Sequence, residues 1–380
     1  MSSIKKIIFL LIGLISASLL GIVMLELIFG SWLTEDKWKE ANSINIIRDR
    51  QLTYSVKHIY GEEMKTVSYS RDEFGLRGGC KDPKDITILT LGGSTTDQRL
   101  TSDGKTYQDV LQALLREEMG SDICISNAGV DGHSTFGHLA SFDKWFPLIP
   151  QLKPKYFLLY IGINDAGFVS KPISVFDTYK RSTESSLLST LREKSALYQL
   201  LKKSRDIFLS LNSHNAYAEH SSRPPFESEY TAQSLSADAF SQVEKNSKAF
   251  QQRLVGILGE ISNRDATPIC VSQPHLAVSN RNGKTLGLPN MFYFEEKSYN
   301  GLDYEFSINS LNATMKKLCI QADGFYIDIA AKSFERGDYY DVVHMNSNGT
   351  FKLGKYLFEE FKTKGIITDI KRSYDEPIKP

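Results

Sequence analysis

The hydrophobic positions of the chain form short apolar runs that alternate with longer stripes of helical spacing. Five apolar runs predict buried strands, at 86–91, 123–125, 156–161, 267–272 and 325–329. Apolar residues spaced three and four apart predict helices at 107–115, 240–261 and 347–361. Strands that alternate with helices are typical of a parallel sheet covered on both faces. We therefore predict an α/β fold, a flavodoxin-like three-layer α/β/α sandwich around a five-stranded parallel sheet.

The N-terminus carries a different pattern, an uncharged run from Ile7 to Leu25 that is long enough to span a bilayer. Lys5 and Lys6 precede this run, which favours a cytoplasmic N-terminus and an extracytoplasmic position for the rest of the chain. We interpret the segment as an uncleaved single-pass transmembrane helix. A cleaved signal peptide is the alternative, although the run exceeds a typical signal core and no convincing cleavage site follows it.

These patterns divide the chain into segments. We expect a cytoplasmic tail at 1–6, the anchor at 7–30, an extracytoplasmic spacer at 31–84 that packs on the α/β domain, the domain itself at 85–365, and a C-terminal tail at 366–380. Within the domain, residues 168–235 are longer than a connection between a strand and a helix requires. We interpret them as an insertion with a helix around 197–209, which either sets ligand choice or decorates the surface without ligand contact.

The composition and net charge limit the classes of partner that we expect. The 380 residues are 41% hydrophobic and 24% charged, which is ordinary for a globular protein, and the formal net charge is zero. Binding to phosphate backbones requires a basic excess, so we expect no nucleic-acid partner. The Cys and His spacings do not resemble a zinc site, and we expect neither a metal nor a cofactor.

The four cysteines, Cys80, Cys124, Cys270 and Cys319, are an even number in a chain that we place outside the cytoplasm, where disulfides are permitted. Three pairings are possible. Cys80 with Cys124 would join the region before the first strand to its neighbour. Buried free thiols at Cys124 and Cys270 are an equal alternative.

A candidate nucleophile follows the first predicted strand. The run at 86–91 ends in Gly-Gly-Ser-Thr-Thr, which places Ser94 on a tight turn at the carboxyl edge of the sheet, where open α/β folds bind ligands. A serine hydroxyl becomes nucleophilic when an imidazole takes its proton, and a carboxylate fixes the tautomer of that imidazole. The segment Asp341-Val-Val-His344 could supply both groups from one loop.

Two more polar segments follow predicted strands, Asn127-Ala-Gly-Val-Asp-Gly132 and Gly162-Ile-Asn164-Asp165. Acyl transfer develops negative charge on a carbonyl oxygen, and fixed hydrogen-bond donors stabilise that charge. We expect an oxyanion hole made by the backbone N–H groups of Ser94 and Gly132 and the side-chain amide of Asn164. Gln273 follows the fourth strand and is a further candidate for substrate binding, whereas we interpret the neighbouring His275 as part of a polar turn.

Each motif also has an ordinary structural interpretation. Gly-Gly-Ser-Thr alone is found in plain turns and phosphate-binding loops, Asn-Asp in turns, and Asp-x-x-His at the start of helices such as the one predicted at 347–361. The four signals occur in one order, three of them at the ends of predicted strands. This combination favours an active site over coincidence.

In these four blocks the chain resembles the SGNH (GDSL-type) hydrolase superfamily, whose blocks carry Ser, Gly, Asn and His in this order. The resemblance covers residues 85 to 363. It implies a nucleophile, two oxyanion-hole residues, a base and the partner that orients the base, which are Ser94, Gly132, Asn164, His344 and Asp341. One block departs from the family pattern, because it reads Gly-Gly-Ser rather than Gly-Asp-Ser. Any role of the family's Asp beside the nucleophile is open here.

The resemblance implies a serine esterase that works through an acyl-serine intermediate. Because the anchor faces the cell envelope, we favour an O-acetyl or short acyl ester on an envelope or surface polysaccharide, in the periplasm if the envelope is Gram-negative. The expected partners are thus an ester-bearing glycan and, through the N-terminal helix, the lipid bilayer. An O-acyltransferase that modifies a cell-surface glycan and a non-catalytic carbohydrate-binding or assembly factor are the alternatives.

Overall fold

The computed structural model describes residues 3–30, 32, 37–60, 66–120, 123–167, 194–198, 200–201, 204 and 224–375. The chain forms two compact units. One consists of Met1–Lys39 with Thr178–Ser213, and the other of Glu40–Asp177 with His214–Pro380. The second unit contains the main sheet and all six candidate site residues.

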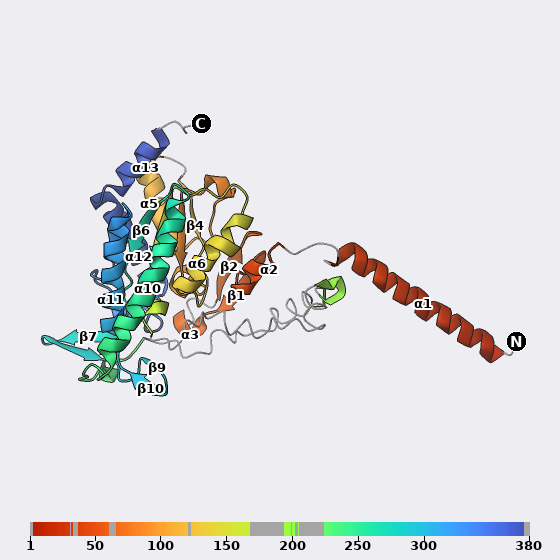
Figure 1. Ribbon diagram of the computed structural model, residues 1–380, viewed down its shortest axis with the longest axis horizontal. Coiled ribbons are helices and arrows are strands. Elements are labelled where there is room, and N and C mark those ends of the chain that lie inside the picture. Colours follow the sequence, from red (N-terminus) through yellow and green to blue (C-terminus); the bar gives the residue numbers. More distant parts are fainter. Residues whose placement is uncertain are drawn as a thin grey trace. The chain divides into compact units, whose positions relative to one another are not determined.

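The second unit is built on a parallel sheet (Figure 1). Its five strands are β3 (Ile88–Gly92), β4 (Ile125–Asn127), β5 (Tyr156–Tyr160), β6 (Thr267–Val271) and β11 (Phe325–Ile327). They lie in the order β11-β6-β5-β3-β4, and Ile88 of β3 pairs with Ile125 of β4 and Tyr156 of β5. The five apolar runs in the sequence correspond to these strands, although β3 and β4 each begin two residues later than expected.

Helices cover both faces of this sheet (Figure 1). They are α5 (Tyr107–Met119), α12 (Ser347–Thr363) and α13 (Ile366–Asp375) on one face, and α6 (Thr135–Lys144), α10 (Ala239–Ser262) and α11 (Gly301–Gln321) on the other. Alternate residues of β5 point to opposite faces. Leu158 joins the core beneath α5, α12 and α13, whereas the Phe157 ring lies 5.3 Å from that of Phe142 in α6. The three-layer α/β/α sandwich is confirmed.

Several shorter elements were not visible in the hydrophobic pattern. Three antiparallel hairpins pair β1 (Arg50–Ser55) with β2 (Thr66–Arg71), β7 (Val278–Arg281) with β8 (Lys284–Gly287), and β9 (Phe292–Phe294) with β10 (Lys297–Tyr299). Short helices occur at α2 (Lys39–Ser43), α3 (Lys57–Tyr60) and α4 (Ser94–Asp97). Most of these segments are three to six residues long and partly exposed, so they give little periodic signal.

The C-terminal tail expected at 366–380 needs a correction. Residues 366–375 form α13, and Ile366, Ile367 and Ile370 are buried in the core with α12. Their spacing of one, three and four residues places them on one face of a helix. This apolar face packs into the core, whereas a tail would be exposed to solvent.

Both disulfide bonds of the second unit lie beside the sheet. Cys80 is bonded to Cys124, just before β4, and Cys270 of β6 is bonded to Cys319 of α11. The pairing of Cys80 with Cys124 was one of the possibilities in the sequence. The alternative of free thiols at Cys124 and Cys270 is wrong, because both cysteines are disulfide-bonded.

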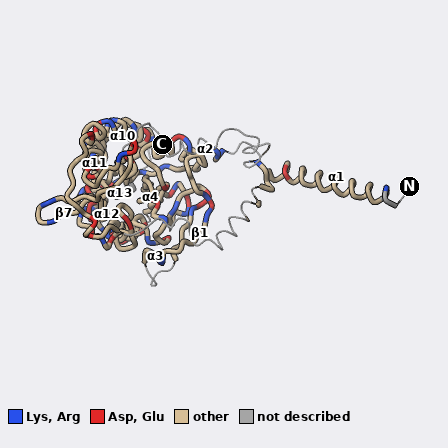
Figure 2. The backbone as a smooth tube through the Cα atoms, turned by 90° about the horizontal axis from the view of Figure 1, so that it is seen from below, with Lys and Arg blue, Asp and Glu red and all other residues tan. Residues whose placement is uncertain are grey.

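The first unit contains α1 (Ser3–Phe29), whose stretch Ile7–Phe29 has a mean hydropathy of 2.8 and exposed side chains. It is long and apolar enough to cross a membrane, a test that a signal sequence also passes. Figure 2 shows its charges near the two ends of the helix. Near the second end, the Glu26 carboxylate accepts hydrogen bonds from the Ser195 hydroxyl and the N–H of Ala196, at 2.7 and 2.9 Å.

Most of the insertion expected at 168–235 lies outside the described residues, at 168–193 and 205–223. Of the helix expected at 197–209, residues 197, 198, 200, 201 and 204 are described, and they are helical. The end of the insertion, residues 224–235, belongs to the second unit, and there the Tyr230 hydroxyl donates to the carbonyl of Leu276 at 2.7 Å.

Candidate active site

Ser94 is the first residue of α4, directly after β3 and Gly93. This places its side chain at the carboxyl edge of the sheet, as the apolar run before it predicted. Its Oγ lies 2.7 Å from Nε2 of His344, although 250 residues separate the two in the sequence. The structure thus brings the candidate nucleophile and the candidate base into direct hydrogen-bond contact.

His344 and Asp341 lie in the loop before α12. Oδ2 of Asp341 is 2.7 Å from Nδ1 of His344, and Oδ1 accepts the backbone N–H groups of Val343 and His344 at 2.8 and 2.7 Å. The carboxylate is therefore held by its own loop while it orients the imidazole. The ring of Tyr340 stacks on the imidazole, with centroids 5.5 Å apart and planes within 4°. Tyr340 had no functional signal in the sequence.

The charges around His344 favour its role as a base. Burial alone would lower the pKa of the imidazole, but its hydrogen bond to Asp341 and the negative charges of Asp341 and Asp131 raise that pKa above the ordinary value. Burial would likewise raise the pKa of Asp341, yet the hydrogen bond and charge of His344 lower it. An ionised Asp341 beside the imidazole is the arrangement that a candidate base requires.

Gly132 and Asn164 lie in loops after β4 and β5. Asn164 belongs to a 3₁₀ turn, Ile163–Asp165, and its side chain is exposed. Its Nδ2 donates to the carbonyl of His133 at 2.8 Å, which ties the two loops together. An amide nitrogen carries two hydrogens, so one remains for a ligand. Gly132 has a φ of +78°, a left-handed conformation that glycine adopts readily.

The departure from the family's first block has a steric explanation. A Cβ at position 93 would lie 2.6 Å from Nδ2 of Asn164 and 2.9 Å from the carbonyl oxygen of His133. The backbone at Gly93 therefore touches the loop of Asn164, and a side chain such as Asp does not fit without displacing it. The same contact shows that the Asn164 amide lies beside the Ser94 turn.

Gln273 is buried and lies between these loops. Its Oε1 accepts the N–H of Ile163 at 2.9 Å, and its Nε2 donates to the Thr95 hydroxyl at 2.7 Å. The amide thus links the neighbour of Ser94 to the neighbour of Asn164. His275 is in a satisfied turn, because Nδ1 accepts the N–H of Ala277 and Nε2 pairs with Glu305 at 3.0 Å.

A partly buried ion pair supports the turn that carries Asn164. Asp165 pairs with Arg253 of α10 at 3.2 Å and accepts the N–H of Thr135, the residue that begins α6, at 3.1 Å. The Asn246 amide donates to the carbonyl of Asp165 at 2.6 Å. Arg253 lies 88 residues from its partner, so no local sequence pattern connects the two.

We expect Asn164→Ala to lower kcat by about 10²–10³-fold with little change in the unfolding midpoint, because one donor is lost where charge develops. Steady-state kinetics on an aryl acetate would measure this. Asn309→Ala is the matched control, since Asn309 is an exposed amide that bonds only Glu305 among the described contacts. A higher KM with an unchanged kcat would instead mean that Asn164 positions substrate.

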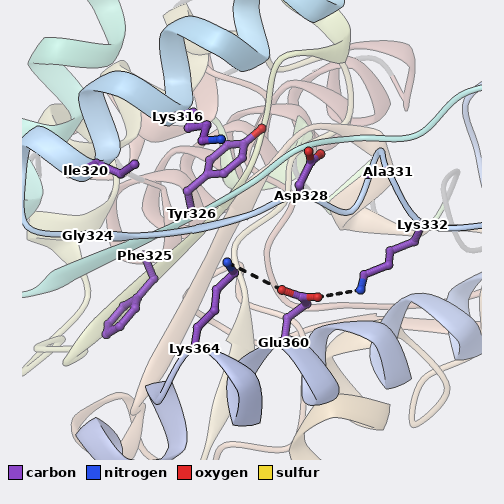
Figure 3. Close-up of a pocket in the computed structure, with 10 residues that line it drawn as sticks. All are labelled: Lys316, Ile320, Gly324, Phe325, Tyr326, Asp328, Ala331, Lys332, Glu360 and Lys364. Atoms are coloured by element: carbon purple, nitrogen blue, oxygen red, sulfur yellow. Dashed lines mark ion pairs between the residues drawn. The ribbon is translucent and has the colours of Figure 1, made fainter.

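A separate groove of about 590 Å³ lies along the edge strand β11, between α11 and the end of α12 (Figure 3). Glu360 lies between Lys332 and Lys364 there, with N–O distances of 2.6 and 3.8 Å. None of the six candidate site residues lines it. The groove is therefore not the pocket of the candidate site.

A parallel α/β sandwich that carries a Ser–His–Asp hydrogen-bond chain at the carboxyl edge of its sheet has the architecture of a serine hydrolase. Residues 90–350 match the model of the GDSL-like lipase/acylhydrolase family. The chain belongs to this family of ester-bond hydrolases. No protein with a curated description matches the chain by sequence.

Among solved structures, the chain is similar to a member of the lipolytic G-D-S-L family from Veillonella parvula, with 13% identity, 72% of this chain and 97% of the other covered, and a TM-score of 0.39. It is also similar to a catalytic mutant of Axe2, an acetylxylan esterase from Geobacillus stearothermophilus, with 11% identity, 72% and 92% covered, and a TM-score of 0.38.

Proposed function

We propose that the protein is a membrane-anchored serine esterase that removes O-acetyl or other short acyl groups from an envelope or surface polysaccharide. The observation that carries this proposal is the 2.7 Å contact between Ser94 Oγ and His344 Nε2, with Asp341 on the other ring nitrogen. A serine hydroxyl aligned in this way is prepared to lose its proton to the imidazole.

In the first half of the reaction, His344 takes the proton of Ser94 as Oγ attacks the ester carbonyl. The carbonyl oxygen gains negative charge, which the N–H groups of Ser94 and Gly132 and the Asn164 amide stabilise. His344 then donates its proton to the leaving alcohol, which departs and leaves an acyl-serine. In the second half, His344 takes a proton from water as the water oxygen attacks the acyl carbonyl. The bond between the acyl carbon and Ser94 Oγ then breaks, His344 returns the proton to Oγ, and the acid product departs.

Three observations support the substrate and its location. The side chains near the reacting groups include the polar or charged Thr95, Asp131 and Asn164, which suit a sugar ester better than a long acyl chain. The two disulfide bonds favour an oxidising compartment. The apolar helix Ile7–Phe29 supplies an anchor that would hold the enzyme at the envelope.

The test is an assay of the full-length protein in alkali-washed membranes, with acetylated polysaccharides and aryl esters of increasing chain length as substrates. We expect acetate release from the polysaccharide, a kcat/KM that falls as the acyl chain lengthens, and activity that stays with the membranes. Turnover confined to long acyl chains would contradict the polysaccharide ester, and activity in the wash would contradict the anchor. Acetyl transfer to an added glycan in place of acetate release would indicate the transferase.

A further inference from the structure

Arg71, the last residue of β2, is buried with all five of its N–H donors in use. The Nε donates to the Tyr69 hydroxyl at 2.8 Å and Nη1 to the carbonyls of Gly75 and Asn127 at 2.9 and 3.1 Å. The Nη2 donates to the carbonyl of Gly129 at 2.6 Å and to the carboxylate of Asp97. A guanidinium has five donors in a fixed planar fork, so this side chain specifies the relative positions of all its acceptors.

Three of the five acceptors of Arg71 belong to the two segments that carry Ser94 and Gly132, namely Asp97, Asn127 and Gly129. Asp97 is the last residue of α4, the four-residue helix that begins at Ser94. Gly129 and Asn127 lie in the segment that leads from β4 to Gly132. A helix of four residues has too few internal hydrogen bonds to fix its own position. Contacts from outside this helix must therefore set the position of Ser94 relative to the loop that carries Gly132.

Asp97 is the other half of this contact. It is 1% exposed, and it accepts the Tyr69 hydroxyl at 2.9 Å and Nη2 of Arg99 at 3.1 Å in addition to Arg71. Burial alone would raise the pKa of Asp97, but the charges of Arg71, Arg99 and Arg77 lower it, so the carboxylate stays ionised. Arg99 also lies 3.5 Å from Asp131, the residue before Gly132.

A second arginine of the same segment contacts the end of α4 and the residues that follow it. Arg77 donates to the carbonyls of Asp97 and Thr101 at 2.7 and 2.5 Å, and its backbone pairs with that of Asn127. Both arginines precede the family-matched residues 90–350. The region expected to be a spacer thus contacts the segments that carry Ser94 and Gly132.

We propose that Arg71 is a positioning residue for ester hydrolysis, which holds the Ser94 turn and the Gly132 loop at the separation that the reaction requires. The inference rests on the proposed serine esterase. Arg71 itself touches neither Ser94 nor His344 in any described contact, so it acts through Asp97 and the carbonyl of Gly129. A purely structural arginine would stabilise the fold without changing the turnover of the folded enzyme.

Arg71→Lys tests this, because lysine keeps the charge but cannot present a planar fork to five acceptors. With an aryl acetate and the full-length protein well below its unfolding midpoint, we expect kcat to fall by about 10²-fold with KM within about threefold, the scale of a displacement of about 1 Å in a site. Labelling of Ser94 by a fluorophosphonate should slow in parallel. Arg264→Gln is the matched control, since Arg264 pairs with Glu260 and donates to a carbonyl of α6 away from both loops.

A folded Arg71→Lys enzyme with wild-type kcat and labelling rate would overturn the proposal, as would a loss of kcat in Arg264→Gln of the same size. If Arg71→Lys does not fold, Tyr69→Phe removes only the hydroxyl between Arg71 and Asp97. We expect it to fold and to lose about tenfold in kcat, and an unchanged kcat would again overturn the role. A wild-type protein that neither turns over the ester nor reacts with the phosphonate would refute the esterase itself, which separates the two failures.

Discussion

Replacement of Ser94 by alanine should lower kcat by about six orders of magnitude, the scale observed when a triad loses its nucleophile. The reason is geometric. Ser94 Oγ is the atom that His344 Nε2 contacts at 2.7 Å, and no other hydroxyl has a described contact with that nitrogen. A stopped assay with an aryl acetate at high enzyme concentration would measure the residual rate.

Ser241→Ala is the control, because Ser241 is an exposed serine of α10 whose hydroxyl donates only to the carbonyl of Asp238 among the described contacts. Its kcat should match that of the unaltered protein. Both variants should have the same unfolding midpoint. Near wild-type hydrolysis by a folded Ser94→Ala protein would show that Ser94 is not the nucleophile, and the assignment of the active site would be wrong.

His344→Ala should cost about as much as the loss of Ser94, again about six orders of magnitude in kcat, since neither residue works without the other. Asp341→Asn should cost less, about 10⁴-fold, because the imidazole remains but is no longer held in the correct tautomer. The same aryl acetate assay gives both values. Equal and small losses for the two variants would contradict the assigned roles.

The Asp341→Asn variant also has a signature in its pH dependence. Asp341 raises the pKa of His344, so its loss should lower that pKa. His344 acts as a base only when it is neutral, and kcat/KM therefore rises as the pH increases through this pKa. The acid limb of the kcat/KM profile should move to lower pH in Asp341→Asn. A limb that stays in place would mean that the observed ionisation belongs to another group.

The sequence predicted the central sheet well because its strands are buried on both faces. Continuous apolar runs such as 156–161 have few alternatives in a chain of alternating helices, and the glycines and polar residues after them located three of the four site segments. The segment with Asp341 and His344 does not directly follow a predicted strand. The spacing of a carboxylate and an imidazole three residues apart indicated it, and the family resemblance supported the same two residues.

The supports of the site could not be predicted in this way. Arg71 lies 26 residues from Asp97 and 58 from Gly129, and Arg253 lies 88 from Asp165, so no local pattern connects these partners. Buried arginines look like surface arginines in a hydrophobicity profile. The hairpin that carries Arg71 has half-exposed strands, so apolar and polar residues are mixed along it and the segment looks polar in the sequence.

The Cys80–Cys124 bond closes a covalent ring that contains β3, Ser94 and α5, with a sequence separation of 44 residues. On the polymer model of cross-linking, a ring of this size lowers the entropy of the unfolded chain and so raises the free energy of unfolding by about 4 kcal/mol. A chain made in a reducing cytoplasm would lack that contribution in the segment that holds the nucleophile. Production for biochemistry should therefore direct the chain to an oxidising compartment, and reducing agents in the assay buffer would act on the fold as well as on the thiols.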